Sequence, residues 1–145
     1  MRLARRGVIA ALLGAFALPS ASWAQKAEPT TFVVFFNFKH ARLSRSARQA
    51  LAKAAETIKA ESAAGRLSHV KAIGYADTVG SAGGAQKLSQ ARADAVRAEL
   101  ARLGVTADKI TTEARGKTEL AVPTADQVRE PRNRRVRIVL YRPGD

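Results

Sequence analysis

The sequence predicts an α/β fold of the two-layer α+β type, with a mixed sheet that carries both long helices on one face. Stretches with strand and helix patterns follow one another in the order strand-helix-strand-helix-strand-strand. Right-handed crossovers between the strands place both helices on the same face of the sheet. The last stretch, residues 134–141, alternates cleanly, with Val136, Ile138 and Leu140 on one side, as strands do.

The first half of the chain predicts one strand and one helix. Residues 31–36 are β-branched and aromatic, which favours a buried strand. Ser44 or Ser46 can cap the helix that follows, which ends near Gly65. The apolar residues of this helix recur at helical spacing: Leu51, Ala54, Ala55 and Ile58.

The second half predicts three strands, a helix and a helical turn. A strand over 70–75 leads into a glycine-containing loop, and a helix then runs to about Leu103 and stops at Gly104. A third strand begins at Ile110 and ends near residue 114. We expect a helical turn over 123–128 before the final strand.

The N-terminus is predicted to be a secretory signal peptide over residues 1–24. A basic start precedes an apolar stretch over 7–19, which is too short to span a bilayer. Ser22 and Ala24 are small residues at the positions that favour cleavage after Ala24. The alternative is an uncleaved membrane anchor, and Arg5-Arg6 also admits a twin-arginine route. Residues 25–30 are then a disordered lead-in and 31–142 the domain, with no transmembrane segment in the mature chain.

The charge favours anionic partners without selecting one. There are 25 Lys and Arg against 12 Asp and Glu, so removing the three arginines of the signal peptide leaves 22 − 12 = +10. An exported protein rarely meets nucleic acid, so we predict no nucleic-acid partner. A basic, solvated surface explains the charge equally well. The chain has no cysteine, which excludes both a lipid-attachment motif and disulfides.

No motif for catalysis is found. Without cysteine there is no thiol nucleophile, and His40 and His69 are isolated rather than at metal-ligand spacing. Neither a Gly-x-Ser-x-Gly elbow nor a phosphate-binding loop occurs. We predict a protein that is not an enzyme and has no cofactor or metal.

Asp77 and Arg92 are the candidate binding residues. Asp77 follows the 70–75 strand in a loop bounded by glycines, and Arg92 lies in the next helix. On a wheel with Leu88 at zero, Arg92 falls near +40°, inside an apolar arc of roughly −60° to +120°. A buried guanidinium needs a carboxylate partner, from the protein or from a ligand. One carboxylate and one guanidinium suit a zwitterion, although Asp77 could instead cap the helix, and Arg92 could pair structurally with Asp77 or Glu99.

Several separated motifs resemble those of the OmpA-like peptidoglycan-binding domains of Gram-negative bacteria. They are the opening strand 33–38, Gly74-Tyr75-Ala76-Asp77-Thr78-Val79-Gly80, Leu88-Ser89-Gln90-Ala91-Arg92-Ala93, residues 104–110 and the closing run 128–140. The Arg-Glu-Pro-x-Asn-Arg-Arg run at 129–135 is similar to one subgroup. The resemblance covers Thr31 to Tyr141 and implies a β-α-β-α-β-β fold that binds the cell wall noncovalently in the periplasm, in association with the outer membrane or the wall.

The resemblance also assigns roles to residues. It implies that Asp77 accepts hydrogen bonds from an amine of diaminopimelate in the stem peptide, and that Arg92 binds the carboxylate of the same centre. It implies supporting positions at Asn37, Phe38, Lys39, Thr78, Leu88, Asn133 and Arg134, with structural support at least as well favoured as ligand contact for the last two.

The sequence departs from the family pattern around this site. Ala76 replaces a threonine, Gly84-Ala85 replaces Tyr-Asn, and Lys39 stands where a carboxylate or amide is usual. Lys39 would repel an incoming amine. These changes favour an alternative, an envelope scaffold that contacts another envelope protein and has lost wall binding. A third alternative is a basic protein that binds lipopolysaccharide or another polyanion through Arg129, Arg132, Arg135 and Arg137.

Overall fold

The computed structural model describes residues 28–145. The predicted signal peptide, and the lead-in as far as residue 27, lie outside the described residues. Residues 28–30 precede the first strand without regular secondary structure.

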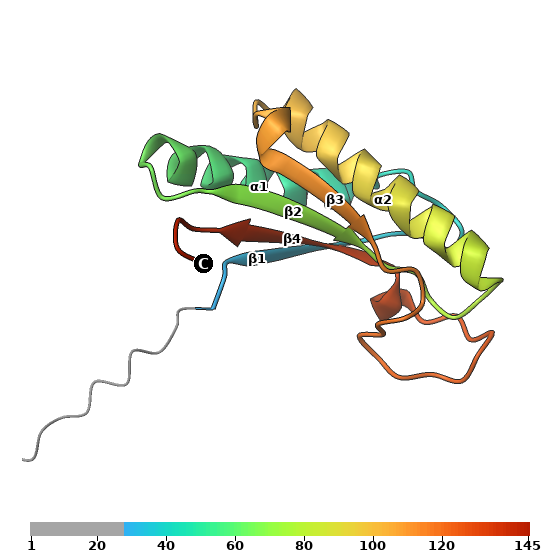
Figure 1. Cartoon of the computed structure of the whole chain (residues 1–145). Helices are drawn as coiled ribbons and strands as arrows, with labels where there is room; N and C mark the ends of the chain where they lie inside the picture. The colour runs from blue at the N-terminus through green and yellow to red at the C-terminus, as the bar shows by residue number, and fades with distance from the viewer. Residues whose placement is uncertain (1–27) are drawn as a thin grey trace, which may run out of the picture.

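The sheet has four strands and is mixed, as predicted (Figure 1). They are β1 (Thr31–Phe35), β2 (His69–Gly74), β3 (Ile110–Ala114) and β4 (Arg135–Tyr141). Their spatial order is β1-β4-β2-β3. The last strand of the chain, β4, therefore lies between β1 and β2 and is antiparallel to both, while β2 and β3 are parallel.

Both long helices, α1 (Arg45–Ala63) and α2 (Ala82–Arg102), cover the same face of the sheet, which confirms the predicted layers (Figure 1). Each begins where a serine side chain replaces a missing backbone partner. The Ser44 hydroxyl accepts from the amide of Ala47 at 3.1 Å, and Ser81 accepts from Gly84 at 3.0 Å. Of the two predicted caps for α1, the structure uses Ser44.

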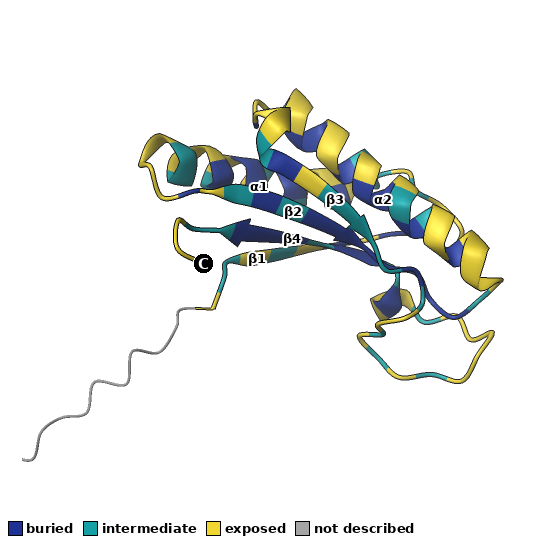
Figure 2. Ribbon diagram, viewed as in Figure 1, coloured by how far each residue is buried: buried dark blue, intermediate teal, exposed yellow. Residues whose placement is uncertain are grey.

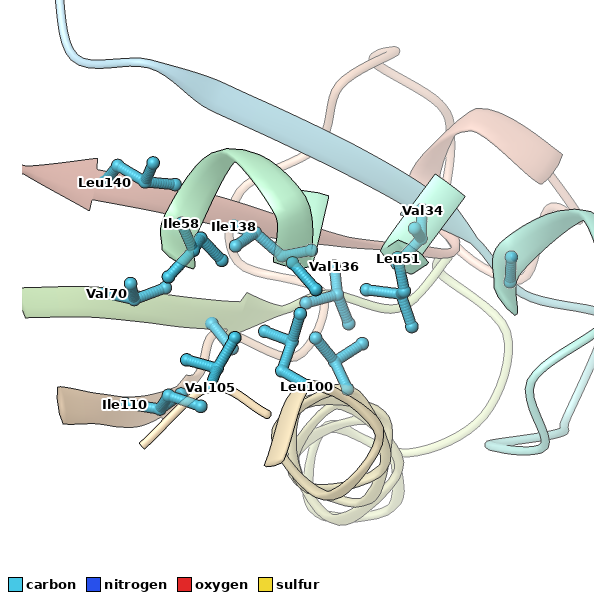
Figure 3. Close-up of a cluster of buried hydrophobic side chains, with 14 of the residues drawn as sticks. Val34, Leu51, Ile58, Val70, Leu100, Val105, Ile110, Val136, Ile138 and Leu140 are labelled. Atoms are coloured by element: carbon cyan, nitrogen blue, oxygen red, sulfur yellow. The ribbon is translucent and has the colours of Figure 1, made fainter. Parts of the chain in front are cut away.

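The core lies between the helices and the sheet (Figures 2 and 3). Leu51 of α1 and Leu100 of α2 pack with Val136 and Ile138 of β4, and all four are fully buried. The alternation expected for the last strand is thus confirmed. The odd-numbered residues of β4 lie on the face that no helix covers.

Helix α2 approaches the end of β2 so closely that only glycine fits at position 74. A β-carbon added to Gly74 would lie 1.9 Å from the carbonyl oxygen of Ser89. Such contact is far inside van der Waals distance. The buried Ser89 hydroxyl donates to Gln86 O at 2.9 Å and accepts from the amide of Gly116 at 3.0 Å. The bond from Gly116 holds α2 to the chain that follows β3.

The expected helical turn over 123–128 is wrong. A 3₁₀ turn forms instead at Pro131–Asn133, where proline occupies the start of the turn. The Glu130 side chain caps it by accepting from the amide of Arg132 at 3.0 Å. The preceding residues form a long irregular loop, which hangs below the end of the sheet in Figure 1. A second 3₁₀ turn, Ala107–Lys109, leads into β3.

Within residues 28–145, no helix has both the length and the apolar character that a membrane crossing requires.

Candidate functional site

Asp77 lies just beyond the end of β2, in the loop that leads to α2. It is 5% exposed. One carboxylate oxygen, Oδ1, accepts from the amide of Val79 at 3.3 Å, which bends the loop. The other, Oδ2, accepts from Arg134 Nη1 at 3.3 Å. The partner of Asp77 is thus the arginine that precedes β4.

Arg134 joins three parts of the site. Its Nε donates to the carbonyl of Phe36 at 3.0 Å, at the end of β1, while Nη1 reaches Asp77. The two charged side chains are 13% and 6% exposed, so this ion pair is largely shielded from water. The Asp77–Arg134 pair was not anticipated from the sequence, although both residues stood in motifs that we singled out.

Arg92 is fully buried, as its place on the helical wheel indicated. Its guanidinium donates to three carbonyl oxygens: His40 at 2.9 Å, Tyr75 at 3.0 Å and Asn37 at 3.2 Å. The Phe36 ring centroid lies 5.4 Å from its Cζ. Because carbonyl oxygens supply its partners, the expected carboxylate within the protein is not needed.

The two structural ion pairs considered for Arg92 are both absent from the described part of the chain. Asp77 pairs with Arg134, and Glu99 pairs with Arg102 at 2.6 Å. Carbonyls from the end of β2 and from the loop after β1 meet at the guanidinium instead. Sequence spacing could not reveal this convergence, because it depends on how two loops fold.

The charge of Asp77 nevertheless acts on the guanidinium of Arg92. Burial lowers the pKa of Arg92 to about 10; the charge of Asp77 opposes this shift, and that of Arg134 adds to it. The guanidinium stays protonated at neutral pH. The site thus holds two cations and one carboxylate in a largely dry environment.

Thr78 and Asn133 fasten the long loop that follows β3. The Thr78 hydroxyl donates to the carbonyl of Ala125 at 2.8 Å and accepts from the amide of Val128 at 2.9 Å. The Asn133 side chain accepts from the amide of Val122 and donates to its carbonyl, both at 2.9 Å. Both side chains are buried, and in this structure they organise the loop.

Further hydrogen bonds tie the Asp77 loop to the same long loop. Lys117 Nζ donates to Gly80 O at 2.8 Å and to Asp126 at 2.9 Å. Gly80 and Gln127 exchange two hydrogen bonds, at 2.9 and 3.1 Å. The conformation of the Asp77 loop therefore depends on residues that lie some 40 positions further along the chain.

The loop after β1 forms the outer wall of the site. Asn37 and Lys39 are exposed, and Lys39 has a left-handed backbone with φ 56°. The half-buried Phe38 ring lies under Arg129, at 3.8 Å from its Cζ, with Arg134 at 6.0 Å and Lys39 Nζ at 5.4 Å. The site is therefore rimmed by positive charge, as Lys39 had suggested.

The remaining predicted positions lie on or near α2. Leu88 is half-buried, one turn before Arg92. Ala76 and Ala85, two of the departures from the family pattern, are buried, whereas Gly84 is exposed near the start of the helix. Beside the site, a groove of about 330 Å³ is lined by Phe35, Asn37 and Arg134, among others.

The fold and the site together define the class of protein. It is a small α/β domain with a carboxylate and a buried guanidinium near the loop that connects β2 to α2. The chain belongs to the OmpA family, whose model matches residues 35–134. This confirms the resemblance.

Two relatives are similar in sequence. An outer membrane protein of Gluconacetobacter diazotrophicus is 34% identical over 117 residues, which are 77% of this chain and 30% of the relative. Outer membrane protein A of Bordetella avium is 33% identical over 104 residues, which are 72% of this chain and 52% of the relative. The chain thus spans about a third and a half of their lengths.

Solved structures have the same fold. The peptidoglycan-associated lipoprotein of Burkholderia pseudomallei is 26% identical with a TM-score of 0.67, covering 76% of this chain and 90% of that one. The OmpA-like domain of FopA1 from Francisella tularensis is 27% identical with a TM-score of 0.66, covering 77% and 74%. The periplasmic domain of Helicobacter pylori MotB, at 18% identity and a TM-score of 0.64, shares the fold.

Proposed function

We propose that this chain binds peptidoglycan noncovalently in the Gram-negative cell envelope, and that Asp77 and Arg92 hold one diaminopimelate centre of the stem peptide. The fold is that of a peptidoglycan-associated lipoprotein, and the relatives are outer membrane proteins. An envelope location and a cell-wall ligand are the roles that these similarities support.

The observation that carries the proposal is the coupling of Asp77 and Arg92. Arg92 donates to the carbonyl of Tyr75, which stands two residues before Asp77, and the charge of Asp77 acts on the pKa of Arg92. A ligand with one ammonium and one carboxylate finds both complementary charges within one small region. Charge-assisted hydrogen bonds to both would be the strong contacts.

Both side chains retain hydrogen-bonding capacity for a ligand. An ionised carboxylate offers about four lone-pair sites, and the contacts to Val79 and Arg134 use two of those of Asp77. A guanidinium has five N–H donors, and the three carbonyl bonds use three of those of Arg92. The site can therefore add a ligand rather than exchange every contact.

The ligand must open a path to Arg92. Because Arg92 is fully buried, a carboxylate reaches it only when the segment 37–40 moves aside. The bond to the Asn37 carbonyl, at 3.2 Å, is the longest of the three, and it comes from an exposed loop residue. We therefore place the opening at this segment. The neighbouring groove, which shares Asn37 and Arg134 with the site, offers room for the rest of the stem peptide.

Sedimentation with purified sacculi tests the proposal. Asp77 and Arg92 would each form a desolvated charge pair with the ligand. Removing one partner of such a pair costs about 2–5 kcal/mol of binding, so Asp77→Ala and Arg92→Ala should each abolish sedimentation. The double variant should be scarcely worse than either. The matched controls are Asp94→Ala and Arg97→Ala, at exposed positions of α2, the helix that contains Arg92. They should bind as the wild type does.

Folding and salt dependence complete the test. Thermal melts must accompany each variant, because Arg92→Ala also strands three carbonyl groups. Binding that survives high salt supports a specific site, whereas binding lost in salt points to bulk charge. If both single variants stay folded and still sediment, Asp77 and Arg92 do not form the binding site.

An envelope scaffold without wall binding is the second candidate. The observation that favours it is the complete burial of Arg92 among backbone carbonyls, which gives this side chain a structural use. Absence of sedimentation by the wild-type protein, in low and high salt alike, would decide for the scaffold.

A further inference from the structure

Strand β1 is an edge strand with none of the usual protection against pairing. Among residues 28–145, it lies at one end of the sheet and has β4 as its single neighbour. Residues 31–36, Thr-Phe-Val-Val-Phe-Phe, contain no charge and no proline. Natural edge strands are commonly blunted by charges, proline or a bulge, because free backbone groups recruit other strands. An edge this apolar is suited to a partner.

The free edge of β1 presents alternate residues. The amide of Phe36 donates to Arg134 O at 2.8 Å, and the carbonyl of Thr30 accepts from Leu140 at 2.9 Å, so the even-numbered residues pair with β4. Along a strand, backbone groups alternate in direction. Those of Thr31, Val33 and Phe35 therefore point away from the sheet; we call these three residues the β1 edge.

The side chains of the β1 edge are exposed too. Val33 is 40% and Phe35 53% exposed. They pair in register with Arg137 and Arg135, odd-numbered residues of β4, and so lie on the face of the sheet that no helix covers. An incoming strand would add both main-chain bonds and apolar side-chain contact, which is the usual chemistry of strand addition.

Two arginines stand beside this edge on the same face. Phe35 pairs in register with Arg135, and Val33 with Arg137. Arg135 lies flat against Tyr75, with its Cζ 3.8 Å from the ring centroid, and is 9% exposed. Its Nη1 is buried and has no hydrogen-bond partner within residues 28–145. Arg135 thus leans toward Tyr75, just beyond the end of β2 and away from β1, so Arg137 is the arginine that a strand added to β1 can reach.

The acidic groups on this face are already engaged. Glu113 of β3 pairs with Arg115 at 2.5 Å and with Lys71 at 3.5 Å. Arg137 has no carboxylate within 4.0 Å in the described part of the chain. Glu119, whose charge acts on Arg135, pairs with Arg115, so Arg137 is a cation on this face that lacks a carboxylate partner within residues 28–145.

We propose that the β1 edge binds an extended acidic segment of a partner protein as a fifth strand, with carboxylates of that segment facing Arg137. A second copy of this chain fits less well. Pairing two β1 strands would bring two such arginine pairs onto the same face of one continuous sheet, in a chain of net charge +13. Phe35 of the β1 edge also lines the groove beside the Asp77–Arg92 site, whereas Thr31 and Val33 do not. The inference does not depend on the proposed wall binding.

A designed peptide probes the edge. We would use an acetylated, amidated nine-residue peptide of alternating threonine and glutamate, and follow backbone amide shifts of the ¹⁵N-labelled protein with the predicted signal peptide removed. Shifts should concentrate in β1 and β4. The same peptide with glutamine for glutamate should bind about two- to fivefold more weakly, as should the Arg137→Gln protein. Arg45→Gln, at an exposed position of α1, should change nothing.

Two changes test strand addition itself. Val33→Pro removes an amide that points outward and breaks no bond to β4, so the protein should fold and lose peptide binding while sacculus sedimentation stays as in the wild type. A peptide N-methylated at alternate residues should fail with the unaltered protein. Shifts that spare β1, equal binding of the glutamine peptide, or undiminished binding of the N-methylated peptide would each overturn the proposal. A dimer of the free protein that Val33→Pro dissociates would also overturn it, in favour of a second copy.

Discussion

Replacing Gly74 by alanine should disrupt the packing of α2 against β2, which positions the residues of the site. The new β-carbon would stand 1.9 Å from Ser89 O and 2.8 Å from Ser89 C, both backbone atoms that cannot rotate away. Relieving this contact requires β2 and α2 to separate by more than about 1 Å. Overpacking a well-packed interior lowers the free energy of unfolding by about 1–3 kcal/mol. Because main chain lies on both sides of this contact, we expect a value at the upper end of that range.

That cost is large enough to measure. For a domain of this size, 1 kcal/mol corresponds to roughly 3–5 °C in Tm, so Gly74→Ala should melt about 10 °C or more below the wild type. The separation would also displace Arg92, one turn beyond Ser89, from the Tyr75 carbonyl that it contacts at 3.0 Å. Sacculus binding, if present in the wild type, should therefore weaken even at temperatures where the variant is folded.

Gly83→Ala is the matched control. It lies in the same helix, and an added β-carbon there meets nothing within 4 Å. Alanine is favoured over glycine in a helix by about 1 kcal/mol, so this variant should melt slightly above the wild type by differential scanning calorimetry. A Gly74→Ala protein with an unchanged melting temperature would refute the close approach of α2 to β2.

Three further changes have defined outcomes. Lys39→Asp should tighten wall-fragment binding, measured by calorimetry, by about 1 kcal/mol relative to Lys39→Asn; because Asp and Asn both tolerate the positive φ, their difference isolates the charge. Equal affinities would place Lys39 outside the site. Acid should destabilise the fold: the hydrogen bond from Arg102 lowers the pKa of Glu99 below 4.5, so its stabilisation is present above pH 4.5 and is lost as pH falls through the lowered value. Thermal melts of Glu99→Gln should accordingly show a lower Tm at neutral pH and a shallower fall in acid, and an identical acid profile would contradict this. Thr78→Val should cost about 1–3 kcal/mol and speed amide exchange over residues 117–130, because buried partners of the hydroxyl lose their bond; exchange unchanged in that loop would show that the hydroxyl does not hold it.

The secondary structure could be predicted because its causes are local. Alternation along 134–141 and helical spacing before Leu103 are properties of neighbouring residues, and Ser44 is a cap wherever a helix follows. The wrong helical turn over 123–128 has a local cause as well. Pro123 and Pro131 give equal signals for the start of a turn, and the Glu130 cap favours the second.

The candidate site could be predicted only in part, because its contacts join distant segments. The wheel placed Arg92 in the interior, but the carbonyls of Asn37 and His40 reach it only through the fold of a loop. The Asp77–Arg134 pair spans 57 positions and needs β4 to lie beside β2. The spacing of residues along the sequence does not indicate that these distant segments meet in the fold.

The position of β4 has a consequence for how this chain is made. Residues 135–141 are the last strand to be synthesised, yet they form the bond between β1 on one side and the β2-β3 pair on the other. Until they arrive, no strand joins β1 to the β2-β3 pair among residues 28–145, and β1 contacts the rest of the domain mainly through α1. Completion of the sheet must wait for residues 135–141, whose pairing with β1 closes a loop of about 100 residues and therefore forms slowly. Termination or proteolysis before residue 135 would thus leave strands unpaired, among them the uncharged β1, and open to aggregation.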